Sequence, residues 1–224
     1  MKIIANMMLV LLLLGVGTLH AESDEAAQRN REGAKLIEQG KMEEALEAFQ
    51  KAVELDANDP VPRLNLAYTY DRQGRTEEAI AEYRKAIELN PSNLLAYNNL
   101  GVLYDKMGQY DEAIREFKRA LEIDPSDANT LKNLENAKKN KAVIQEREGE
   151  LAELRREVEA KPDDPLALYK LGRLYAFYDR IDEAIEWINK ALEKGYDALD
   201  YITFDPALEK LRGDPRFDKL LQKY

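Results

Sequence analysis

Residues 94–127 read LLAYNNLGVLYDKMGQYDEAIREFKRALEIDPSD, and this stretch decides the fold. Gly108 falls where a first helix would end in a left-handed residue, and Pro125 falls where a second helix would stop. The spacing of the other marked positions fits two helices joined by a short turn. Together these positions are Tyr97, Leu100, Gly101, Tyr104, Gly108, Ala113, Phe117, Ala120 and Pro125. The stretch therefore predicts a helix–turn–helix unit of 34 residues.

The same pattern recurs at residues 60–93 and again at residues 26–59, without an insertion. In the middle copy the matching residues are Leu66, Ala67, Tyr70, Gly74, Ala79, Tyr83, Ala86 and Pro91. In the first copy they are Gly33, Leu36, Gly40, Ala45, Phe49 and Ala52, and Ala57 replaces the closing proline. The small residues fall where the paired helices would approach closely. Three copies at one period predict a stacked helical array.

This pattern resembles the tetratricopeptide repeat. The resemblance covers most of residues 26–199 and implies an all-α superhelix, or solenoid, in which the first helices of successive repeats line a concave groove. Such a groove holds a peptide or helix of a partner protein. On this basis we expect repeats at residues 26–59, 60–93 and 94–127. No stretch shows the alternating β-branched pattern of a strand.

The second half of the chain is less regular. Residues 128–164 form an irregular linking unit, in which we expect one helix over residues 128–141 and another over 148–160, separated by a polar stretch. A further repeat-like unit covers residues 165–198, with Asp179 in place of the turn glycine. Residues 199–224 should form a helical cap with two short helices that begin at Asp205-Pro206 and Asp214-Pro215.

Residues 1–21 have the order of a secretory signal peptide. Lys2 gives a positive start, residues 7–14 (MMLVLLLL) are apolar, and small residues lead to a cleavage point after Ala21. The alternative is an uncleaved membrane anchor, because the uncharged span of residues 3–21 approaches the length that crosses a bilayer. In both cases the rest of the chain would be exported, and we expect a periplasmic location in a bacterium.

Composition excludes several classes of function. The net charge of −10 argues against nucleic acid as a partner. There is no cysteine, and the single histidine, His20, lies in the expected signal peptide, so Ser-His and Cys-His catalysis are excluded after cleavage. Most carboxylates fall at helix starts, where they cap the helix or suit its dipole. We therefore expect no enzyme activity, no cofactor and no metal site.

The predicted groove provides the candidate site. Its residues, placed by the family resemblance, are Asn30, Leu64, Asn65, Tyr68, Asn98, Asn99, Val102 and Asn133. Asn65, Asn99 and Asn133 lie 34 residues apart, and each amide is both a donor and an acceptor. Such a row could bond to the backbone of a ligand, or it could bond to neighbouring helices. Leu64, Tyr68 and Val102 would add apolar contacts, or would pack partly into the core.

One subclass of the family, the carboxylate clamp that binds chaperone C-termini, is not matched. Asn65 fits its pattern, but the remaining positions hold Asn30, Ala34, Leu95 and Asn99, none of which is basic. We therefore expect a protein-binding module of the cell envelope with a scaffold, assembly or chaperone-like role. The alternative is a structural envelope protein that self-associates through residues 128–160. The sequence leaves the oligomeric state open.

Overall fold

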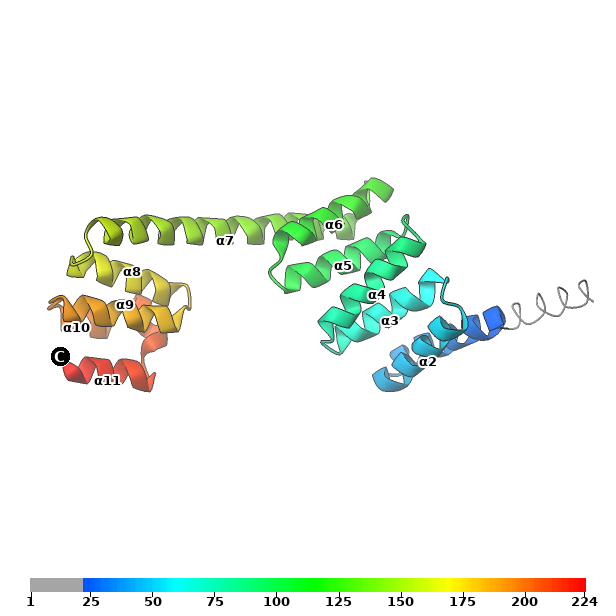
Figure 1. Cartoon of the computed structure of the whole chain (residues 1–224), viewed down its shortest axis with the longest axis horizontal. Coiled ribbons are helices and arrows are strands. Elements are labelled where there is room, and N and C mark those ends of the chain that lie inside the picture. The colour runs from blue at the N-terminus through cyan, green and yellow to red at the C-terminus, as the bar shows by residue number, and fades with distance from the viewer. Residues whose placement is uncertain (1–21) are drawn as a thin grey trace, which may run out of the picture. The chain divides into compact units, whose positions relative to one another are not determined.

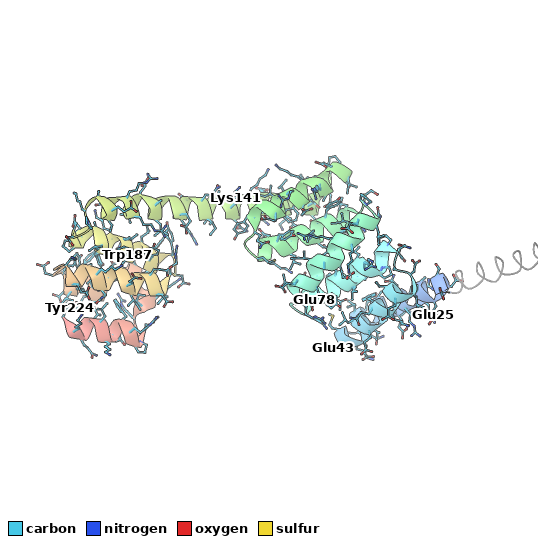
Figure 2. All side chains as sticks on the ribbon, viewed as in Figure 1. Glu25, Glu43, Glu78, Lys141, Trp187 and Tyr224 are labelled. Atoms are coloured by element: carbon cyan, nitrogen blue, oxygen red, sulfur yellow. The ribbon has the colours of Figure 1, made fainter. Side chains whose placement is uncertain are left out.

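The computed structural model describes residues 22–224, and every regular element in that range is a helix (Figure 1). The all-α prediction is thereby confirmed. The expected signal peptide, residues 1–21, lies outside the described residues. Within residues 22–224 no helix combines the length and apolar character needed to cross a membrane. The chain divides at Lys141, labelled in Figure 2, into two compact units that we describe separately.

The first unit consists of helix pairs. A helix through residues 22–38 precedes α2 (Met42–Leu55), α3 (Pro60–Arg72) precedes α4 (Thr76–Leu89), and α5 (Leu94–Lys106) precedes α6 (Tyr110–Ile123). Residues 128–140 of α7 (Ala128–Ala160) complete the unit. Phe49, Tyr83 and Phe117, one from each second helix, are the largest fully buried side chains of its core.

Glycines make the tight turns and the close helix contacts, as predicted. Gly40, Gly74 and Gly108 have φ values of 76°, 74° and 72°, so each closes a first helix in the left-handed region. Gly101 has a different reason to be glycine, because a Cβ atom there would lie 2.6 Å from the buried ring of Phe117. Sequence period and backbone geometry agree throughout this unit.

The second unit contains residues 141–160 of α7, followed by the pair α8 (Pro165–Phe177) and α9 (Ile181–Glu193) and a three-part cap. The cap consists of α10 (Leu199–Phe204), the 3-10 helix η1 (Pro206–Leu211) and α11 (Pro215–Lys223). The prediction of two cap helices was therefore incomplete, because it missed α10. The single tryptophan, Trp187, is partly buried against the core of this unit (Figure 2).

Aspartates start α8, η1 and α11, as expected from their Asp-Pro sequences. Asp164, Asp205 and Asp214 each accept a hydrogen bond from the backbone N–H two residues ahead. Asp179 occupies the position of the turn glycine and has a φ of 66°, which is costly for a residue with a side chain.

The prediction of two separate helices in residues 128–160 was wrong, because α7 is continuous. Ala142 stands where the other repeats carry their turn glycine, and Gly149 lies inside the helix. Without a left-handed residue the chain does not fold back on itself. The earlier part of α7 buries Leu134 and Ala137 in the first unit, and the later part buries Leu151 in the second. The missing turn thus explains why the chain forms two units.

Candidate functional site

Amide side chains connect successive first helices of the first unit. Asn65 Nδ2 donates to Asn30 Oδ1 over 2.8 Å, and Asn133 Nδ2 donates to Asn98 Oδ1 over 3.0 Å. Each bond joins residues 35 apart in the chain. We call the eight predicted groove residues, Asn30, Leu64, Asn65, Tyr68, Asn98, Asn99, Val102 and Asn133, the amide strip. For four of its asparagines the structure shows bonds to a neighbouring helix.

Asn99 is different from the other asparagines of the strip. The residue 35 positions before it is Leu64, whose side chain cannot accept a hydrogen bond, so the amide pair is broken here. The Asn99 amide lies instead beside the hydroxyl of Tyr83. The α3–α5 step of the strip therefore differs from the two steps that flank it.

The Tyr83 hydroxyl is buried and, among residues 22–224, has no hydrogen bond of normal geometry. Burial raises the pKa of Tyr83 well above its usual value, the charge of Asp71 raises it further, and the nearby Asn99 amide partly offsets this. A buried hydroxyl without a well-formed bond costs stability. Tyr83 and Asn99 together thus form a polar centre in which hydrogen-bonding capacity is left over.

Carboxylates on the same helices accept bonds from the next first helix along the chain. Lys106 Nζ lies 3.0 Å from both carboxylate oxygens of Asp71, and Asn140 Nδ2 donates to Asp105 Oδ1 over 3.3 Å. These bonds again join residues 35 apart, on the same first helices as the amide pairs. The Asp71–Lys106 pair therefore adds no net charge beside the polar centre, whereas the neutral Asn140 amide leaves the negative charge of Asp105 in place.

The apolar members of the strip are not equally available. Tyr68 is 37% exposed, whereas Leu64 and Val102 are half-buried and pack against the core of the first unit. Val61 and Leu95, which the family resemblance also places on or near the groove, are exposed at the second position of α3 and α5. Exposed apolar contact thus comes from Tyr68, Val61 and Leu95.

Residues 22–224 offer neither an organised site in the hollow on their first helix nor a cluster of metal ligands. A hollow of about 490 Å³ runs along the helix through residues 22–38, and its lining comes from that helix and the adjoining Gln39, with side chains of both charges. Within residues 22–224 no group of three or more histidine, aspartate or glutamate side chains is placed to hold a metal ion.

The second unit has a hollow that the sequence analysis missed. It has a volume of about 350 Å³ and is lined by Leu154, Lys170, Arg173, Leu174, Phe177 and Ala207. Lys170 occupies the repeat position of Asn65 and Asn99, so the sequence could have identified it as a candidate binding residue. The position of Ala207 beside α8 could not be predicted, because it depends on how the cap folds back.

A buried carboxylate fixes the cap beside this hollow. Asp205 accepts from the Tyr169 hydroxyl over 2.6 Å and from Arg173 Nε over 2.7 Å, and its side chain is inaccessible to solvent. Burial acts to raise the pKa of Asp205, but the two hydrogen bonds outweigh it and hold that pKa below its usual value. Asp205 is therefore ionised at neutral pH and orients Arg173.

Comparison with known proteins identifies the repeats. Family models described as TPR repeat or tetratricopeptide repeat match residues 36–84, 71–108, 95–127 and 149–198. No curated protein sequence matches the chain.

Solved structures of the same fold are similar to this chain. The first TPR domain of Spaghetti (RPAP3), bound to an HSP90 peptide, is 28% identical with a TM-score of 0.52, covering 54% of this chain and 95% of its own. The first TPR domain of human RPAP3 is 26% identical with a TM-score of 0.52, covering 55% and 96%. The MamA RS-1 ArsTM double mutant, at 22% identity and a TM-score of 0.50 over 76% and 94%, shows the fold alone.

Proposed function

The chain belongs to the tetratricopeptide repeat family, and from this premise we propose that its first unit binds an extended peptide segment of a partner protein along the amide strip. The observation that carries this proposal is the polar centre of Tyr83 and Asn99. It interrupts a row of amides that are otherwise paired with one another.

The chemistry of the polar centre suits a peptide backbone. An extended segment offers alternating C=O and N–H groups, and the half-buried Asn99 amide can donate to the first and accept from the second. The Tyr83 hydroxyl is fully buried, so it acts on a ligand only by positioning that amide. Tyr68, exposed on α3, would add aromatic contact area next to the polar centre.

The charges nearby favour recognition of the backbone over recognition of a terminal carboxylate. Asp71 and Lys106 neutralise each other, and the positions that carry basic residues in a carboxylate clamp hold none here. The HSP90 peptide of the Spaghetti domain is therefore a guide to where a ligand lies, and not to its sequence. The partner of this chain would be selected by apolar side chains that contact Tyr68, Val61 and Leu95.

A pull-down with two single variants tests the proposal. Tyr83→Phe removes the unsatisfied hydroxyl, so it should leave thermal stability unchanged or slightly higher while it weakens capture of a crosslinked partner about tenfold. Asn99→Ala should weaken capture to a similar degree. Asn133→Ala is the matched control, since its amide is already bonded to Asn98 and its loss should affect stability more than capture.

Two results would contradict the proposal. Capture of the same partner by the parent and by both variants would place the binding site elsewhere. Capture of the chain's own copies alone would favour the alternative, self-association through α7, on which Val143 and Ile144 are exposed. Analytical ultracentrifugation shows whether the parent chain self-associates, and this distinguishes the second result from the first.

We further propose that the protein is exported to the bacterial periplasm, where it acts as a scaffold, in assembly or as a chaperone-like factor. Support comes from the order of Lys2, the apolar run at residues 7–14 and the small residues before Glu22. N-terminal sequencing of the protein from an envelope fraction should give Glu22 as the first residue. An intact Met1 in the membrane fraction would favour the anchor instead.

A further inference from the structure

We propose that the second unit carries a separate binding site, which accepts an acidic peptide segment with a bulky apolar side chain next to the acid. The site is the hollow of about 350 Å³ formed by α7, α8 and η1. All of its lining residues belong to residues 141–224, so the site does not depend on the amide strip.

Arg173 is held in position for an anion. Its Nε atom donates to the buried carboxylate of Asp205, which also accepts from Tyr169 and from the backbone N–H of Ala207. The plane of the guanidinium group is thereby fixed from one side. Within residues 22–224 the two Nη atoms form no hydrogen bond, and the side chain is 47% exposed. Such a fork is ready for a bidentate contact with a carboxylate.

Lys170 supplies a second cation to the lining. Asp205 compensates Arg173, and the carboxylate of Glu157 lies 3.4 Å from Lys170 Nζ, outside the lining. Both partners of this long pair are about two-fifths exposed, so it contributes little and can be exchanged. The lining contains two cations and no carboxylate, on a chain with a net charge of −10. An acidic segment that replaces Glu157 on Lys170 therefore meets two cations and no carboxylate in the lining.

The remaining lining is apolar and unusually exposed. Phe177 is 65% exposed at the end of α8, and Leu154 and Leu174 are only partly buried against the core. An exposed aromatic ring beside two aliphatic side chains favours an apolar side chain of a partner. A free inorganic anion would leave this wall uncovered. The combination selects a peptide in which glutamate or aspartate adjoins leucine, isoleucine or phenylalanine.

Two peptide pools provide the test. The first contains acetylated and amidated nonapeptides in which acidic residues alternate with leucine, isoleucine or phenylalanine, and in the second pool lysine and arginine replace the acids. The full chain should retain the acidic pool at least tenfold more strongly than the basic pool. Equal retention of the two pools would overturn the proposal.

Substitutions of exposed lining residues locate the site. Lys170→Glu should remove the preference for the acidic pool, and Phe177→Ser should weaken retention at least tenfold. Arg173 is left unchanged, because its replacement would also break the contact with Asp205. The matched controls are Lys161→Glu and Phe204→Ser, which alter exposed residues of the same types outside the hollow and should retain the acidic pool as the parent does.

The first unit offers an independent reference. Tyr83→Phe should bind the acidic pool as well as the parent does, even where it loses the partner captured by the amide strip. Undiminished binding by Lys170→Glu and Phe177→Ser would contradict the second site while leaving the first proposal intact. Loss of the acidic pool in Tyr83→Phe would assign the peptides to the first unit and also overturn the second site.

Discussion

Corresponding positions of the two units form different surfaces because different elements pack against their first helices. In the first unit, Asn98 accepts from Asn133 of the next helix, and the surface is a neutral row of paired amides. In the second unit the corresponding residue is Tyr169, which donates to Asp205 of the cap. One repeat pattern thus produces a neutral strip or a cationic hollow, and the element that follows decides between them.

Another contact is common to both units. Gln50 donates to the hydroxyl of Tyr70 over 3.0 Å, Arg84 donates to that of Tyr104 over 2.8 Å, and Arg155 donates to that of Tyr175 over 2.8 Å. In each case a second helix contacts the first helix that follows it, 20 residues later. The later part of α7, which carries Arg155, therefore has the role of a second helix even though no turn precedes it.

The largest expected effect comes from removing Asp205, the buried carboxylate that fixes the cap of the second unit. Asp205→Ala leaves the Tyr169 hydroxyl buried without a partner and removes the cap of η1, so it should lower the free energy of unfolding of the second unit by about 2–4 kcal/mol. Trp187 fluorescence during urea unfolding reports this unit alone, because it is the only tryptophan.

Acid provides a check on the same residue. Because the folded-state pKa of Asp205 is lowered, its contribution to stability is present above the unfolded pKa of about 3.9 and is lost as the pH falls through the folded value. Asp205→Asn should therefore reduce the loss of stability at low pH, measured by Trp187 fluorescence.

Asp214→Ala removes a solvent-accessible cap and should lower the free energy of unfolding by about 1 kcal/mol. An equal loss for Asp205→Ala would contradict the special role of the buried carboxylate.

The next prediction compares a close helix contact in each of the two units. Gly101→Ala places a methyl group 2.6 Å from the ring of Phe117 and should destabilise the first unit by about 1–3 kcal/mol, seen by circular dichroism with the Trp187 transition unchanged. Gly172→Ala meets both the side chain and the backbone nitrogen of Ile188, so it should shift the Trp187 transition instead. A shift of that transition by Gly101→Ala would contradict the separation into two units.

The helix pairs and their turns could be predicted from the sequence, because the 34-residue period places glycines such as Gly108 at left-handed turns. The continuity of α7 was missed because its polar middle, residues 138–149, was interpreted as a break. Lysine, glutamate and arginine are good helix formers, and only a glycine at position 142 would have signalled a turn.

The candidate site could be predicted only in part. The period placed the asparagines on one face, but the bonds join residues 35 apart, so the partner of each amide depends on the offset between helices. Leu64 interrupts the row, and its effect on Asn99 becomes visible only when that offset is known. The hollow of the second unit depends on the contact between Asp205 and Tyr169, which lie 36 residues apart and share no repeat position.

A smaller effect, of opposite sign, tests the turn of the second unit against those of the first. Asp179→Gly relieves a positive φ that costs about 1–2 kcal/mol in a non-glycine residue, and it loses only an exposed ion pair with Lys210. It should raise the stability measured by Trp187 fluorescence by about 1 kcal/mol. Gly108→Asp, the reverse change in the first unit, should be destabilising by a similar amount. A change in stability of the same sign in both variants would show that the two turns are not equivalent.

The smallest effect tests why the chain forms two units at all. Gly149 lies inside α7, and a Cβ atom there would meet nothing within 4 Å apart from its chain neighbours and the nearby backbone of its own helix, so Gly149→Ala should stabilise the helix by about 0.5–1 kcal/mol. Ala142→Gly should destabilise it by a similar amount, because glycine is a poor helix former. The change also restores the glycine found at the turns of the other repeats. Amide hydrogen exchange over residues 141–150 should slow in the first variant and accelerate in the second. Unchanged exchange in both would mean that the continuity of α7 does not depend on the absence of a turn glycine, and the division into two units would then need another cause.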